Sequence, residues 1–269
     1  EALGDDFQRT PIGTGPFMFD EYQPQQYVKL VANPEYFRGA PQISEIYYRY
    51  IPSDASRVLA FQSGEIDMIY GRQDQTWVER ISQIEGAEVV VMTPGEMSVI
   101  HLNMTMPPLD DLRVRQAVAH AINRDAMVEF KGPAVTLAAV SPVPEGYMGY
   151  SADVPLYEHS VDKAKALLAE AGHPDGVTVK AIHTTLPGML STMEAVQALL
   201  REAGITLEIE TVEHATFHEQ IRQDLSQVTH YSAARFPVAD VYLTQFFHSD
   251  SIVGTPTAVT NFSHCAVAV

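Results

Sequence analysis

The stretch over residues 107–127, PPLDDLRVRQAVAHAINRDAM, restricts the fold more than any other part of the chain. Pro107 and Pro108 prevent a helix from starting before Leu109, because proline lacks the backbone N–H and disfavours helical backbone in the residue before it. Two aspartates follow, and their carboxylates can accept hydrogen bonds from the free N–H groups of a first helical turn. Apolar residues then recur at helical spacing, at Val114, Ala117, Val118, Ala121 and Ile122. The sequence therefore predicts an amphipathic helix that begins here and buries one face.

Composition excludes several classes of protein. The chain has 269 residues, 46% of them hydrophobic, which is enough for one large core or two smaller ones. Its formal net charge of −17 repels phosphate backbones and anionic lipid headgroups, so neither nucleic acid nor a membrane surface is an expected partner. No apolar run is long enough to span a bilayer, and any export signal is expected to have been removed or to lie upstream. Cys265 is the only cysteine, which excludes an internal disulfide and a cysteine-rich metal site.

Short β-rich runs alternate with helical patterns along the whole chain, which is typical of an α/β fold. In the first hundred residues the expected strands are 17–19, 27–32, 46–51, 66–70 and 89–91, and the expected helices are 55–63 and 75–84. A strand at 96–103 leads into the capped helix, and a loop rich in proline and glycine follows at 132–150. Beyond it we expect helices at 160–172, 189–203 and 214–225 and strands at 177–183 and 205–212. This order predicts a second α/β lobe with a mixed sheet.

Five phrases of the sequence, in the same order, resemble the peptide-type extracytoplasmic solute-binding proteins that serve ATP-driven importers. The capped helix matches the block Pro-Pro-hydrophobic-Asp-Asp-x-x-Val-Arg-Gln-Ala-x-x-x-Ala-x-x-Arg of that family. The other four are PIGTGPF at 11–17, NPEYFRGAP at 33–41, SGEID at 63–67 and the segment 162–176 with its Ala-Lys-x-Leu-Leu-x-x-Ala-Gly pattern. Each phrase alone has little specificity, but five in order cover most of the chain.

The resemblance implies an α/β fold of the two-lobed periplasmic binding protein type with mixed sheets. Residues 1–97 would then be part of lobe one, and residues 98–269 would form lobe two, which lines the ligand cleft. The beginning of lobe one and its C-terminal return are absent by comparison with the family. The chain is therefore expected to be a fragment, and lobe one is expected to expose strand edges or an apolar face.

The resemblance also indicates candidate ligand contacts. In peptide binders of this family, the strand before a helix that ends in Gly-Ile carries an Arg or His that meets the ligand carboxylate, and His183 holds that place here. Arg235 takes the place of an aspartate that receives the amino group of a peptide, which favours an anionic or N-blocked ligand. A shift of this register by a few residues would instead make Asp240 the relevant acid. The crossing strand 96–103 is expected to pass the cleft floor, which adds Met97 and Ser98.

The function implied by the resemblance is that of a non-enzymatic, periplasmic or otherwise extracytoplasmic component of an ABC importer. It would capture a small peptide-like or anionic solute and deliver it to a membrane permease with ATPase subunits, with no cofactor and no metal.

Two alternatives remain. A hydrolase or metal-dependent enzyme has little support, because no Gly-x-Ser-x-Gly motif occurs and Cys265 is next to His264 near the C-terminus. His214 and His218 stand four residues apart, but the glutamate that follows the first histidine of zinc proteases is missing, so a solvated helix face is favoured over a metal site. The other alternative is a ligand-free interaction or chaperone module.

Overall fold

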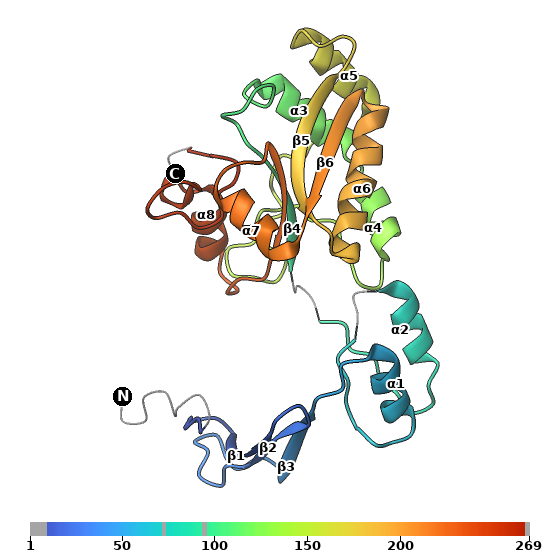
Figure 1. Ribbon diagram of the computed structural model, residues 1–269, viewed down its shortest axis with the longest axis vertical. Coiled ribbons are helices and arrows are strands. Elements are labelled where there is room, and N and C mark those ends of the chain that lie inside the picture. Colours follow the sequence, from blue (N-terminus) through green and yellow to red (C-terminus); the bar gives the residue numbers. More distant parts are fainter. Residues whose placement is uncertain (1–9, 72–73, 93–95, 267–269) are drawn as a thin grey trace. The chain divides into compact units, whose positions relative to one another are not determined.

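The structure is a computed structural model that describes residues 10–71, 74–92 and 96–266. It divides into two compact units, Glu1–Gly71 and Arg72–Val269, and each unit is considered by itself (Figure 1). The lobe boundary expected after Met97 therefore falls inside the larger unit. Compact units and family lobes are different divisions of a chain, so that boundary stays a prediction.

The smaller unit is a three-stranded antiparallel sheet followed by one helix. Its elements are β1 (Phe17–Gln23), β2 (Tyr27–Ala32), β3 (Glu45–Arg49) and α1 (Asp54–Gln62), with the strands in the order β1-β2-β3. Tyr47 and Tyr48 of β3, the strand at one edge, are both exposed. Helix α1 begins at the Ser53 cap, whose side chain accepts a hydrogen bond from the Ser56 N–H.

The strands expected at 66–70 and 89–91 do not form. After α1 the N–H groups of Glu65 and Ile66 donate back to the Ala60 carbonyl, which closes the helix end. The side chains of Met68 and Val90 are then largely exposed. Because a strand is stabilised by pairing and by packing against its neighbours, a short apolar run that faces solvent gains neither.

The larger unit mixes helices and strands along the chain (Figure 1). Its elements are α2 (Gln75–Ser82), β4 (Met97–Leu102), α3 (Leu112–Ala121), α4 (Arg124–Lys131), α5 (Val161–Glu170), β5 (Val177–Thr184), α6 (Pro187–Glu202), β6 (Ile205–Val212), α7 (His214–Arg222), β7 (Val228–Ala233), α8 (Ala239–Phe247) and the 3-10 turn η2 (Ser249–Ser251). The helix that begins after the two prolines ends at Ala121, and Asn123 caps a separate helix, α4. Strand β7 and helix α8 are additional to the elements expected from the sequence.

Four strands of the larger unit meet as two pairs. Strands β5 and β6 are parallel and start together, with Val177 opposite Ile205, whereas β4 and β7 are antiparallel. Gly176 has a φ of +98°, and a Cβ there would lie 2.4 Å from the Gly204 carbonyl oxygen, so only glycine allows this close start. The Ser226 hydroxyl accepts from the Ile182 N–H at 3.0 Å and joins β5 to the segment before β7.

The main core lies where α3, α5 and α6 pack against β5 and β6 (Figure 1). The helical face predicted from the sequence is buried, because Val114, Ala117, Val118 and Ala121 are at most 2% exposed. Burial of a valine or leucine side chain contributes roughly 1.5–3 kcal/mol relative to exposure. The apolar stripe of α3 therefore stabilises the larger unit directly.

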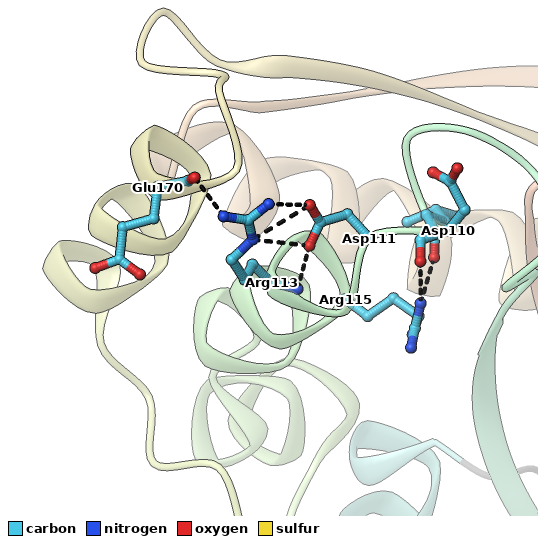
Figure 2. A network of polar contacts seen from close by, with 6 residues as sticks. Asp110, Asp111, Arg113, Arg115 and Glu170 are labelled. Atoms are coloured by element: carbon cyan, nitrogen blue, oxygen red, sulfur yellow. Dashed lines mark hydrogen bonds and ion pairs between the residues drawn. The ribbon is translucent and has the colours of Figure 1, made fainter.

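The start of α3 confirms the predicted cap. Asp111 is the N-cap and accepts from the Arg113 N–H at 2.8 Å, while its carboxylate also binds the Arg113 guanidinium. Arg113 donates on to the Glu170 carbonyl at the end of α5, as Figure 2 shows. These hydrogen bonds lower the pKa of Asp111 to about 2. Asp111 thus caps α3 and, through Arg113, ties it to α5, whereas Asp110 contributes its backbone carbonyl to Arg115.

Candidate ligand-binding site

Two imidazole rings connect an exposed serine on β4 to the backbone at the end of β5. Ser98 Oγ lies 2.8 Å from His230 Nε2, and His230 Nδ1 lies 3.1 Å from His183 Nε2. His183 Nδ1 in turn lies 3.1 Å from the Thr184 carbonyl oxygen. The two rings are parallel to within 4°, with centroids 5.4 Å apart, as expected for imidazoles joined edge to edge through their nitrogens. We call Ser98, His230, His183 and the Thr184 carbonyl the histidine row.

The register of β4 and β7 explains how this row forms. Ser98 is opposite Ser232, and Ile100 is opposite His230. Because side chains alternate along a strand, these four residues share one face of the ladder, which we call the polar face. The other face packs against α8 and is called the α8 face; it carries Met97, Val99, His101, Tyr231 and Ala233.

Both histidines of the row are neutral at pH 7. His183 is fully buried and His230 is 2% exposed, and burial disfavours the charged imidazolium. Burial lowers the pKa of His230 to about 4, and electrostatic interaction with His183, Lys131 and His101 shifts it in the same direction. Burial also lowers the pKa of His183, although its hydrogen bond to Thr184 opposes the shift. The row therefore consists of hydrogen-bonded neutral groups.

Arg235 follows β7 and is held by α8. Its N–H donates to the Tyr242 hydroxyl at 3.1 Å, and its guanidinium donates to Gln245 and to the Ala234 carbonyl. The guanidinium also lies over the Phe246 ring, 5.5 Å from its centroid. The structure thus brings Ser98 and His183 together through His230, whereas it holds Arg235 on the α8 side.

The other predicted site residues are placed on the α8 side as well. Met97 is buried in a cluster with Tyr242 and Phe246, so its thioether is part of a core. Asp240, the acid of the shifted register, is exposed in the first turn of α8 and accepts from the Thr244 hydroxyl at 3.4 Å. No observation decides between the two registers, and both stay predictions.

The histidines of α7 do not assemble a metal centre in the described residues. His214 and His218 have rings 4.6 Å apart, and His214 Nδ1 lies 3.2 Å from the Thr184 hydroxyl. Within residues 10–71, 74–92 and 96–266 no group of three or more His, Cys, Asp or Glu side chains could hold a metal ion. In the same described ranges, none of the helices has both the length and the apolar composition of a membrane span.

Sequence reasoning missed His230, which occupies the centre of the row. In the sequence it is an isolated histidine in THYS, with neither a motif nor a charged neighbour. The signal that finds it is the pairing register, since only the alignment of Ile100 with His230 puts the imidazole beside Ser98. That register joins strands more than a hundred residues apart and cannot be read from local patterns.

The fold defines a class of protein. It is a mixed α/β fold shared with solved periplasmic and solute-binding proteins, among them MoaA from A. tumefaciens R10 in complex with mannopinic acid, at a TM-score of 0.77 and 47% identity. Residues 1–253 match the family model described as bacterial extracellular solute-binding proteins, family 5 Middle. The chain belongs to this family of solute-binding proteins, as its five sequence phrases predict.

The similarity to individual relatives covers most of this chain and part of theirs. A putative ABC transporter peptide-binding protein of Brucella ovis is 34% identical over 215 residues, which are 78% of this chain and 40% of the relative. The MoaA comparison covers 99% of this chain and 54% of MoaA. DppA from Helicobacter pylori in complex with the peptide STSA is 25% identical at a TM-score of 0.71, over 96% of this chain and 51% of DppA. The chain thus spans about half the length of the solved structures that it matches.

Proposed function

We propose that this chain is part of the substrate-binding component of an ABC importer and that it binds a small anionic solute without converting it. The observation that carries the proposal is the 47% identity with MoaA over nearly the whole chain, because MoaA was solved with an organic acid. The component would act in the periplasm or another extracytoplasmic compartment and pass the solute to a membrane permease with its ATPase subunits. Residues 1–97 would belong to lobe one and 98–269 to lobe two.

Arg235 is the proposed contact for the acid group of the solute. An arginine side chain has five donor hydrogens, and in the described residues only Gln245 and Ala234 engage its guanidinium by hydrogen bonds. Donors therefore remain for a carboxylate, and the Phe246 ring holds the guanidinium plane in place. Ser98, exposed on β4, is the second proposed contact. The other two residues of the predicted set are buried, Met97 in the core of the α8 face and His183 behind Ser98, so His183 would act through the histidine row.

Calorimetric titration with mannopinic acid and with an unblocked dipeptide tests the proposal. Mannopinic acid is expected to bind saturably and more tightly than the dipeptide, and Arg235→Ala is expected to weaken it by at least about tenfold, because a charge-assisted hydrogen bond contributes about 1.5–3 kcal/mol. Arg222→Ala is the matched control, since this exposed arginine donates only to its own helix at the His218 carbonyl among the described contacts. Its affinity is expected to match that of the unmodified protein.

Three results would contradict the proposal in distinct ways. Unchanged affinity in Arg235→Ala would remove Arg235 from the site. Tighter binding of the dipeptide, abolished by Asp240→Asn, would favour the shifted register and a solute with a free amino group. Conversion of mannopinic acid during incubation, followed by NMR of the mixture, would support an enzyme in place of a binding protein.

A further inference from the structure

All hydrogen bonds of the histidine row are donated in the same direction, because the group at its buried end can only accept. The Thr184 carbonyl oxygen has no hydrogen to give, so the His183 nitrogen 3.1 Å away must carry one. A neutral imidazole has only one N–H, and His183 Nε2 is therefore an acceptor. Its partner at 3.1 Å, His230 Nδ1, must then carry the hydrogen of the second ring.

The same reasoning reaches the exposed end of the row. Because His230 carries its hydrogen on Nδ1, its Nε2 has only a lone pair to offer. Ser98 Oγ lies 2.8 Å from this nitrogen, so the Ser98 hydroxyl donates its single hydrogen inward. Ser232 Oγ is 3.4 Å from the same nitrogen and is the weaker of the two contacts. One lone pair can bind one hydroxyl well, and the shorter distance selects Ser98.

The direction persists only while both rings are neutral. One extra proton on the pair would leave at most one accepting nitrogen, and with His230 Nε2 protonated the Ser98 hydroxyl would no longer donate inward. Burial keeps the rings neutral at pH 7, as the lowered pKa values of both histidines indicate. The titratable groups that act on His230 reinforce this state, because Lys131 of α4 and His101, on the opposite face of the ladder, can contribute only positive charge. His214 of α7 contacts the row at the Thr184 hydroxyl and adds no negative charge.

We propose that Ser98 determines specificity by presenting only lone pairs to the solute, with His230 and His183 as positioning residues that hold its hydrogen inward. The site then favours a hydroxyl or ammonium donor of the solute at this position and disfavours a carboxylate oxygen there. This inference rests on the proposed function and refines it: a donor group of the solute would face Ser98. His183 acts without contact with the solute, which agrees with its full burial.

The direction of the row is measurable without any solute. Two-dimensional NMR that correlates imidazole ring nitrogens with carbon-bound hydrogens distinguishes the tautomers of a neutral histidine. In the ligand-free protein at pH 7, both His183 and His230 are expected as the Nδ1–H tautomer, with resonances assigned by His183→Phe and His230→Phe. An Nε2–H tautomer or a charged ring at either position would overturn the inference, whatever the protein binds.

The role of Ser98 is tested by titration with mannopinic acid at pH 7. Ser98→Ala is expected to weaken binding by about tenfold, the usual effect of one lost hydrogen bond, and Ser98→Thr is expected to restore it because threonine keeps the hydroxyl. Ser232→Ala is the matched control, opposite Ser98 on the same face, and is expected to change affinity less than twofold. Equal affinity in Ser98→Ala and Ser232→Ala would overturn the specificity role.

Failure of the inference and failure of the proposed function give different results. If the unmodified protein binds no mannopinic acid, the proposed function is contradicted and the role of Ser98 toward that solute falls with it, while the tautomers still decide the direction of the row. If the protein binds mannopinic acid and Ser98→Ala binds it equally well, the proposed function stands and the inference fails.

Discussion

On the α8 face of the β4–β7 ladder, His101 is enclosed by the rings of Phe246 and Phe262, whereas on the polar face His230 is hydrogen bonded at both ring nitrogens. Both histidines are 2% exposed, and burial lowers the pKa of each to about 4. His101 nevertheless has no hydrogen-bond partner for its Nε2 within the described residues. Two histidines with equal burial and equal pKa therefore differ in whether their ring nitrogens are hydrogen bonded.

The comparison separates two consequences of burial. On the α8 face the imidazole acts as an aromatic surface, since its contacts are ring to ring and one of its polar atoms is unsatisfied. On the polar face the His230 imidazole links the donor at one end of the row to the acceptor at the other, because its Nδ1 donates and its Nε2 accepts. A lowered pKa thus shows only that an imidazole is buried, whereas its hydrogen-bond partners indicate what the imidazole does. The two faces should respond differently to the same substitutions.

The largest difference is expected in packing. Phe246 is fully buried on the α8 face and contacts the rings of His101 and Tyr242. Phe246→Ala is expected to reduce the free energy of unfolding by about 3–5 kcal/mol, through lost burial and the cavity left behind. Phe130→Ala is the control, because that ring is 54% exposed, and about 0.5 kcal/mol or less is expected. Urea unfolding measures both, and similar losses would show that the α8 face is not a packed core.

The next largest effect is the loss of stability in acid. The pKa of His101 is about 4 in the folded protein and near 6.5 when unfolded, so between these values the unfolded state binds more protons. Stability from this group is complete above pH 6.5 and is lost as the pH falls, by about 3 kcal/mol at pH 4. His101→Leu is expected to remove that part of the acid destabilisation. Urea unfolding at pH 7 and pH 4.5 tests this, and parallel pH dependence in the two proteins would refute it.

Much of the fold could be predicted because it depends on local signals. The Asp111 cap and the apolar stripe of α3 lie within one turn and one helix, and Ser160 caps its own helix in the same way. The strands expected at 66–70 and 89–91 failed because a strand needs a partner, and β-branched composition says nothing about whether one is near. Strand β7 is the reverse case: it forms because β4 lies beside it.

The candidate site could be predicted only in part. The family resemblance points to Ser98 and His183, and the structure connects them through His230. His230 itself depends on a register between distant strands, so no pattern in the sequence around it could indicate its role. Arg235 was predicted to share the site with His183, but its position depends on how the loop after β7 meets α8, which the sequence does not specify.

A direct comparison of the two buried histidines at pH 7 is expected to give an intermediate effect. His230→Leu leaves His183 Nε2 without its partner in a buried setting, and an unsatisfied buried polar group costs about 1–3 kcal/mol. His101→Leu removes an unpaired nitrogen and keeps an apolar side chain among aromatic rings, so its free energy of unfolding is expected to stay the same or rise. Equal losses in the two variants would mean that the hydrogen bonds of the row contribute nothing to stability.

The smallest effect is expected at the exposed end of the row. Ser98→Ala should change the free energy of unfolding by less than about 1 kcal/mol, because Ser98 is exposed and water can replace its hydroxyl at His230 Nε2. Ser226→Ala provides the contrast: its buried hydroxyl donates to the Val228 carbonyl and accepts from the Ile182 N–H, and both partners lose a bond that water cannot reach. That variant is expected to lose about 1–3 kcal/mol. If Ser98→Ala were as destabilising as Ser226→Ala, Ser98 would be a structural residue, and any effect of its removal on solute affinity could be attributed to a damaged fold.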